Sequence, residues 1–172
     1  METEILMLGV VTQRKTIASR WQTHAWRPLE VLVDRAGFAA PPQCILNEPD
    51  DQRWLFSGLE LRLHSDEAEG YFLNATATTP CWFVMSRPEE VSGLQVLMPK
   101  KVTLSYNEAA RLMDGGEQVD TVPASADIVE HLNHFIATWY RPEVKRKRKK
   151  PSFEGGAGVD LMARAEGVHG GQ

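Results

Sequence analysis

Hydrophobic and polar residues alternate in short runs over the first hundred positions, a pattern typical of β-strands. The clearest run is 59–64, in which three leucines alternate with polar residues and therefore fall on one face of a strand. The continuous apolar run 81–85 predicts a strand that is covered on both faces. Ser92-Gly93 predicts a turn into another strand at 94–98. Further strands are predicted at 5–12, 29–33 and 53–56.

The acidic connection after the leucine-rich run predicts a hairpin. Residues 65–70 are polar and end in glycine, which suits a tight turn between two strands. We therefore expect residues 71–74 to form a strand that pairs with residues 59–64.

After residue 104 the pattern changes to that of helices. Ser105 and Glu108 match a capping box, in which each side chain accepts from the other residue's backbone N–H, so a short helix is predicted to begin here and to end at 114–116. A second helix is predicted from Ser125 to just before Pro142. Its apolar stripe comprises Ile128, Leu132, Phe135, Ile136 and Trp139.

These elements predict an α+β fold. We expect an antiparallel β-sheet or small barrel of about 6–8 strands, followed by two C-terminal helices. The second helix, being amphipathic, is predicted to pack on the sheet.

Charge divides the chain into two parts. Residues 1–142 carry 12 Lys and Arg against 19 Asp and Glu, a net charge of −7, whereas residues 143–172 carry 7 against 4, a net charge of +3. The second part contains six consecutive cations, Lys145, Arg146, Lys147, Arg148, Lys149 and Lys150, and is then rich in glycine. We therefore predict one globular domain over 1–142 and a flexible basic tail over 143–172.

Composition favours a cytoplasmic protein. The first residues are acidic where an export signal is basic, and no run approaches the roughly 20 apolar residues of a membrane span. Cys44 and Cys81 are far apart in sequence and are expected to be buried, unreactive thiols rather than a disulfide or a metal site.

A cluster of aromatic and basic residues is the first candidate binding site. Trp21, His24, Trp26 and Arg27 lie within seven consecutive positions, and tryptophan and arginine are enriched at binding hot spots. The alternative interpretation is structural: the two indoles close one end of the sheet and the arginine covers them.

The basic run at 145–150 is the second candidate. Its charge would attract nucleic acid, acidic proteins or acidic membranes, and the structural alternative is a solvated tail. Nucleic-acid binding usually adds aromatic platforms, and this tail has only Phe153.

Signals for catalysis and for metal binding are weak. His131 and His134 share the second helix, but both fall off its apolar stripe and are expected to face solvent, so no metal site is predicted. No nucleophile elbow, phosphate-binding loop, dinucleotide fingerprint or HExxH motif occurs. We therefore predict no catalytic residues and no cofactor. The enzymatic alternative is an unrecognised site around His24.

Several motifs together resemble a known family. They are Trp21, His24 and Trp26-Arg27-Pro28 before a strand, Asn107-Glu108-Ala109-Ala110 leading to Gly116-Glu117, Val122-Pro123, and Lys145-Arg146-Lys147-Arg148. Their order and spacing are similar to those of an uncharacterised bacterial domain family, over about residues 7 to 150. Members of that family are often encoded beside molybdenum-dependent formate dehydrogenases and their maturation factors.

The resemblance implies an accessory role in the assembly, maturation or regulation of such a dehydrogenase, in a bacterial cytoplasm. The expected partner is therefore an oxidoreductase subunit or a maturation factor. The alternative is a nucleic-acid-associated module that uses the basic tail.

Overall fold

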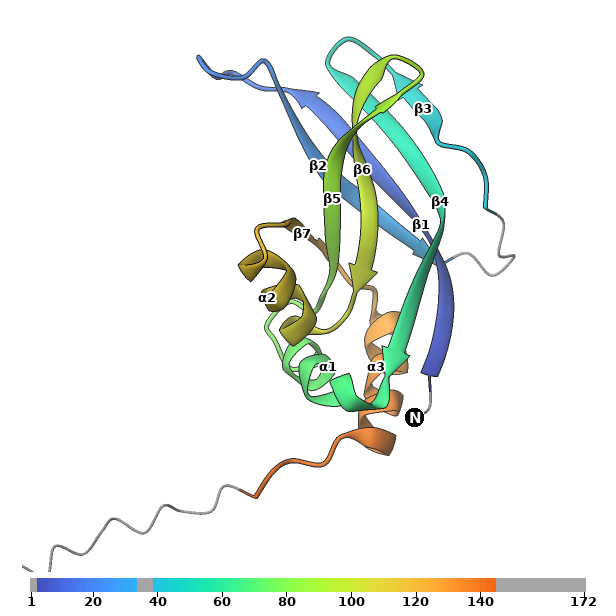
Figure 1. Cartoon of the computed structure of the whole chain (residues 1–172), viewed down its shortest axis with the longest axis vertical. Coiled ribbons are helices and arrows are strands. Elements are labelled where there is room, and N and C mark those ends of the chain that lie inside the picture. Colours follow the sequence, from blue (N-terminus) through green and yellow to red (C-terminus); the bar gives the residue numbers. More distant parts are fainter. Residues whose placement is uncertain (1–2, 34–38, 145–172) are drawn as a thin grey trace, which may run out of the picture. The chain divides into compact units, whose positions relative to one another are not determined.

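The computed structural model describes residues 3–33 and 39–144 (Figure 1). By its internal contacts the chain divides into residues 1–142 and residues 143–172. The predicted basic run, Lys145–Lys150, and the glycine-rich stretch after it lie outside the described residues. None of the described helices has the length and the apolar character needed to cross a membrane.

The first sheet is built from four antiparallel strands. They are β1 (Thr3–Thr16), β2 (His24–Val33), β3 (Gln43–Asn47) and β4 (Asp51–His64), in the spatial order β2-β1-β4-β3. The strands predicted at 5–12 and 29–33 are confirmed within β1 and β2. Those predicted at 53–56 and 59–64 are parts of one long strand, β4, and β3 was not predicted.

The second sheet has three antiparallel strands. They are β5 (Cys81–Val91), β6 (Leu94–Thr103) and β7 (Gln118–Pro123), in the order β6-β5-β7. Ser92 and Gly93 join β5 to β6 with φ of 50° and 80°, the pair of positive angles that a tight hairpin turn requires. The described residues thus form seven strands in two open sheets. This confirms the predicted antiparallel sheet structure of about 6–8 strands; the alternative of a closed barrel is wrong for the described residues.

The predicted hairpin after β4 is wrong. Its residues form a 3₁₀ turn, Ser65–Glu67, and helix α1, Ala68–Ala75. The helix is held by Tyr71, whose hydroxyl accepts from the backbone N–H of His64 at 3.0 Å. It is also held by Asn74, whose amide donates to the carbonyl oxygens of Cys81 and Leu104 at 2.8 and 2.9 Å. These partners lie outside the segment, so local pattern did not reveal them.

Helix α2 (Tyr106–Asp114) begins where its cap predicts. The hydroxyl oxygen of Ser105 accepts from the backbone N–H of Glu108 at 3.1 Å. The second bond of the predicted capping box, from the backbone N–H of Ser105 to the carboxylate of Glu108, does not form. That N–H donates to Oγ1 of Thr103 at 3.0 Å instead. The carboxylate of Glu108 is instead engaged by Lys101.

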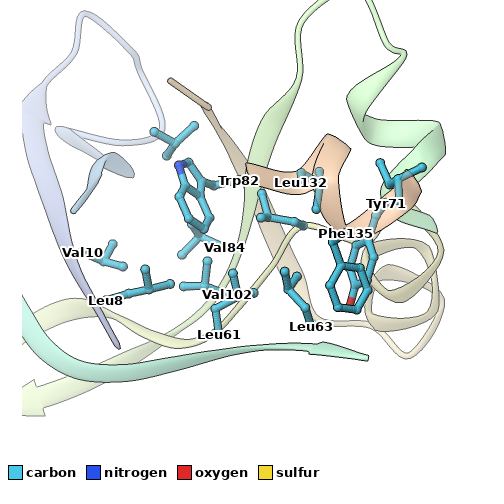
Figure 2. Close-up of a cluster of buried hydrophobic side chains, with 13 residues drawn as sticks. Leu8, Val10, Leu61, Leu63, Tyr71, Trp82, Val84, Val102, Leu132 and Phe135 are labelled. Atoms are coloured by element: carbon cyan, nitrogen blue, oxygen red, sulfur yellow. The ribbon is translucent and has the colours of Figure 1, made fainter. Parts of the chain in front are cut away.

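Helix α3 (Ala126–Trp139) confirms the second predicted helix, although Ser125 makes no side-chain capping bond. Leu132, Phe135 and Ile136 of its stripe are buried, and Phe135 meets Tyr71 of α1 edge to face, with ring centroids 5.6 Å apart. Figure 2 shows this contact within the main core, into which both sheets and α3 project. The core residues labelled there are Leu8, Val10, Leu61, Leu63, Tyr71, Trp82, Val84, Val102, Leu132 and Phe135.

A smaller core lies between the sheets. Trp54 and Phe56 of β4 pack with Val96 of β6, and Trp26 of β2 packs against them.

The two cysteines differ in burial. Cys81 is partly buried, and burial raises the pKa of its thiol, whereas Cys44 is exposed on β3. The prediction that both thiols are buried is therefore wrong for Cys44, whose strand lies at the edge of its sheet.

Candidate binding surface

The loop between β1 and β2 presents an exposed indole. Trp21 is 92% exposed. The loop is closed by the N–H of Ile17, which donates to the carbonyl of Thr23 at 3.1 Å, and the N–H of Trp21 donates to Oγ of Ser19 at 3.2 Å. The fold thus holds the backbone around an indole that is almost fully exposed to solvent.

The pleat of β2 separates Trp26 from Arg27. In the register with β1, Trp26 lies opposite Arg14 and Arg27 lies opposite Gln13, and successive side chains of a strand point to opposite faces. Trp26 packs against the smaller core that contains Val96 of the second sheet. Arg27 therefore lies on the other face, and the interpretation in which it covers both tryptophans is wrong.

On that outer face Arg27 joins a chain of polar contacts. Its Nε donates to Oε1 of Gln13 at 3.2 Å. Nε2 of Gln13 in turn donates to both carboxylate oxygens of Asp51 at 3.1 Å. Arg53 also binds Asp51, at 2.9 Å, and this hydrogen bond lowers the pKa of Asp51 and raises that of Arg53. Arg27 is thus anchored in the first sheet.

Two adjoining hollows surround Trp26 and His24. The first, about 410 Å³, extends toward β6, and the second, about 510 Å³, extends toward the loop that carries Trp21. Gln22, His24, Trp26 and Gln95 line both hollows, and Arg14, Arg20 and Trp21 line the second one. We call these seven residues together the Trp21 surface.

The Trp21 surface is basic within an acidic domain. Arg14 and Arg20 line the second hollow, and neither forms a salt bridge within the described part of the chain. Among the described residues that line the two hollows, none is acidic. Of the four predicted residues, Trp21, His24 and Trp26 come together here, and Arg27 does not. Arg14, Arg20 and Gln95 were not predicted, although Arg20 is adjacent to Trp21 in sequence.

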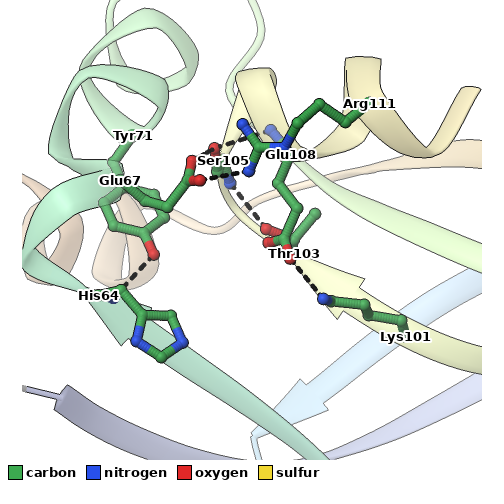
Figure 3. A network of polar contacts seen from close by, with 8 residues as sticks. All are labelled: His64, Glu67, Tyr71, Lys101, Thr103, Ser105, Glu108 and Arg111. Carbon is green, nitrogen blue, oxygen red and sulfur yellow. Dashed lines mark hydrogen bonds and ion pairs between the residues drawn. The ribbon is translucent and has the colours of Figure 1, made fainter. Parts of the chain in front are cut away.

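A second polar cluster joins α1, α2 and β6 (Figure 3). Oγ of Ser105 donates to Oε2 of Glu67 at 2.7 Å, and Arg111 pairs with the other carboxylate oxygen. Burial raises the pKa of Glu108, but hydrogen bonds from Lys101 and Thr103 outweigh it, so the net pKa is lowered. Ser105 is completely buried, and its hydroxyl is used as a helix cap and a tie, so this cluster is structural rather than nucleophilic.

The two helix histidines differ in environment. His134 is exposed as predicted, but His131 is half-buried and its Nε2 lies 2.8 Å from Oε1 of Glu4. Within residues 3–33 and 39–144, no three His, Cys, Asp or Glu side chains are grouped as metal ligands would be.

Most of the chain matches a known protein family. The model of a family described as a protein of unknown function (DUF3305) matches residues 7–149, which include the Trp21 surface, the helices and all strands except the first four residues of β1. The chain belongs to the DUF3305 family. No curated protein and no solved structure matches the chain. The predicted resemblance to an uncharacterised family is thus confirmed.

Proposed function

We propose that this DUF3305 protein is a non-catalytic accessory protein that binds a protein partner through the Trp21 surface. The observation that carries the proposal is the 92% exposure of Trp21 beside the half-buried Trp26. An indole that is almost fully exposed buries little apolar surface within the domain, whereas burial of such a side chain at an interface is among the largest contributions to protein binding.

Charge supports an acidic partner. Arg14 and Arg20 stand beside the indoles, whereas residues 1–142 as a whole carry a net charge of −7. Arginine binds a carboxylate through two parallel hydrogen bonds and also stacks on aromatic rings. A partner surface with an acidic residue next to an apolar pocket would therefore match the Trp21 surface.

The resemblance to proteins encoded beside molybdenum-dependent formate dehydrogenases supports a more specific partner. We infer that the protein assists the assembly, maturation or regulation of such a dehydrogenase, by docking on one of its subunits or on a maturation factor. No redox or transfer chemistry is assigned to the chain itself.

The proposal is tested by pull-down from cells that express the dehydrogenase. The double variant Trp21→Ser with Arg20→Glu should reduce recovery of dehydrogenase subunits or maturation factors at least about tenfold, since hot-spot side chains each contribute 2 kcal/mol or more. Met113→Ser is the matched control, because it removes an exposed apolar side chain from α2. Deletion of the gene should lower formate oxidation and cofactor content; unchanged values of both would refute the dehydrogenase link.

The second candidate function is that of a nucleic-acid-associated module. It is favoured by the six consecutive cations at 145–150 together with the arginines and indoles of the Trp21 surface. It predicts binding to nucleic acid that weakens with salt, with a slope of about −0.7 to −0.9 in the logarithm of the binding constant per phosphate neutralised. Binding should disappear when residues 145–150 are removed; undetectable or salt-insensitive binding would eliminate this candidate.

A further inference from the structure

A second surface, separate from the Trp21 surface, lies beside the other half of β2. In the described part of the chain β2 pairs with β1 alone, so its opposite edge is open. A groove of about 740 Å³ follows this edge and is lined by all five consecutive residues Leu29–Val33. Alternate residues point to opposite faces of a strand, so a groove that touches all five follows the strand edge and not one face.

The floor of this groove is apolar. Trp82 of β5, Val122 of β7 and Ile128 of α3 line it opposite β2. The exposed fractions of Leu32 and Val33 are 41% and 38%, so apolar side chains remain uncovered on both faces of the strand. We call this feature, from Leu29–Val33 across to Ile128, the β2-edge groove.

The carboxylates of the β2-edge groove make it acidic, and its one histidine among the described lining residues, His131, lies against the carboxylate of Glu4. Glu30 on β2 and Asp127 in the first turn of α3 are exposed and line it, and no Lys or Arg is among its described lining residues. Open backbone N–H and C=O groups along a strand edge recognise another extended chain, while alternate side-chain pockets select its residues.

We propose that the β2-edge groove binds an extended segment of a partner protein as an added strand. The segment has apolar side chains at alternate positions, which enter the groove, and Lys or Arg between them, which face Glu30 and Asp127. Five residues of β2 offer about 17 Å of pairing edge. Pro28 limits this edge at one end, because proline has no N–H to donate.

The test uses the full chain and synthetic fluorescent peptides. The probe is Lys-Val-Lys-Val-Lys-Val, and the comparison peptide is Glu-Val-Glu-Val-Glu-Val. We expect the cationic peptide to bind about tenfold more tightly in fluorescence anisotropy, as two favourable charge contacts predict. Amide NMR shifts should then localise to Leu29–Val33 and to the start of α3. Equal binding of both peptides, no binding, or shifts elsewhere would overturn the proposal.

Backbone pairing is tested by methylating the peptide nitrogen at alternate residues. Alternate N–H groups of a strand point to opposite edges, so methylation of odd residues blocks one edge and methylation of even residues blocks the other. One of the two methylated probes should lose about tenfold in affinity or more, and the other should bind like the parent. Equal affinity of the two methylated probes would contradict strand addition.

A charge-reversed groove provides the protein-side test. Glu30→Lys with Asp127→Lys should reverse the preference for the cationic peptide without affecting the pull-down through the Trp21 surface. Glu90→Lys with Asp114→Lys is the matched control, because it changes two exposed acids outside the groove by the same charge. Self-association of the chain that is abolished by the groove variant would assign the edge to a second copy and would also overturn the proposal.

Discussion

The contact between α1 and α2 allows an unusual prediction for Gly70. A Cβ atom added at Gly70 would lie 2.1 Å from Oγ and 3.1 Å from Cβ of Ser105, far inside van der Waals contact. Ser105 is fully buried, so its hydroxyl has no free space to enter. Gly70→Ala must therefore displace the cap of α2.

The magnitude follows from the bonds that Ser105 makes. Alanine in place of a helical glycine normally stabilises by about 1 kcal/mol. Here the substitution would break the cap to Glu108, worth about 1 kcal/mol, and the hydrogen bond to the carboxylate of Glu67, worth about 1.5–3 kcal/mol. The net expectation is a loss of roughly 1.5–3 kcal/mol in the free energy of unfolding.

Urea unfolding followed by tryptophan fluorescence measures this change. With a slope of about 2 kcal/mol per molar, the midpoint should fall by roughly 1 M. The decisive control is the same substitution in a Ser105→Gly background, where no side chain remains at position 105. There Gly70→Ala should cost far less than in the parent chain, because the closest remaining contact of the added Cβ is the backbone nitrogen of Asn107 at 3.3 Å. An equal loss in both backgrounds, or a more stable single variant, would refute the close-approach argument.

Three further predictions concern the core and its titrating groups. Phe135→Ala should lower the free energy of unfolding by about 3–5 kcal/mol in urea titrations, because the ring is buried against Tyr71. Burial raises the pKa of Tyr71 to about 12, so its contribution is complete below about pH 10 and is lost as the pH rises toward 12. Tyr71→Phe should remove that part of the alkaline loss, measured as urea midpoints from pH 9 to 12. The net pKa of Glu108 is lowered, so its contribution is present above about pH 4.5 and is lost on acidification; the difference in stability between Glu108→Gln and the parent chain should shrink from pH 7 to pH 3.

Local signals predicted much of the fold. The alternation at 59–64 appears in β4, where Leu61 and Leu63 are buried and Glu60 and Arg62 form a surface ion pair. Ser92-Gly93 adopts the predicted turn, and Ser105 caps the predicted helix. Each of these signals depends on neighbours within four residues, so a single sequence contains the necessary information.

The missed elements depend on distant partners. Residues 71–74 have a strand-like composition, yet they form a helix whose Asn74 is bonded to the backbone of Leu104, 30 residues away. Tyr71 in the same helix packs on Phe135. Tertiary contacts thus override local propensity in this segment.

The candidate site was only partly predictable. The strand was predicted to begin at residue 29, after Pro28, whereas β2 begins at His24 and carries Pro28 at a bulge. A strand that starts at His24 would already have separated Trp26 from Arg27 by alternation. The presence of Gln95 in this surface could not be predicted from neighbouring residues. Gln95 lies on β6, about 70 residues after Trp26 in sequence, and β6 approaches β2 only because the two sheets pack together.

The open edge of β2 differs in composition from the edge strands of the second sheet, and this difference bears on function. β6 and β7, the edge strands of the second sheet, carry Pro99, Lys100 and Lys101 or end in Pro123, features that discourage pairing with another chain. Leu29–Val33 has neither lysine nor proline, and four of its five residues are apolar. An edge of this composition invites aggregation unless it has an occupant, and the acidic side chains beside it favour a basic one. The same strand therefore supplies Trp26 to one proposed surface and an open backbone to the other, so the two groups of variants should act independently on binding.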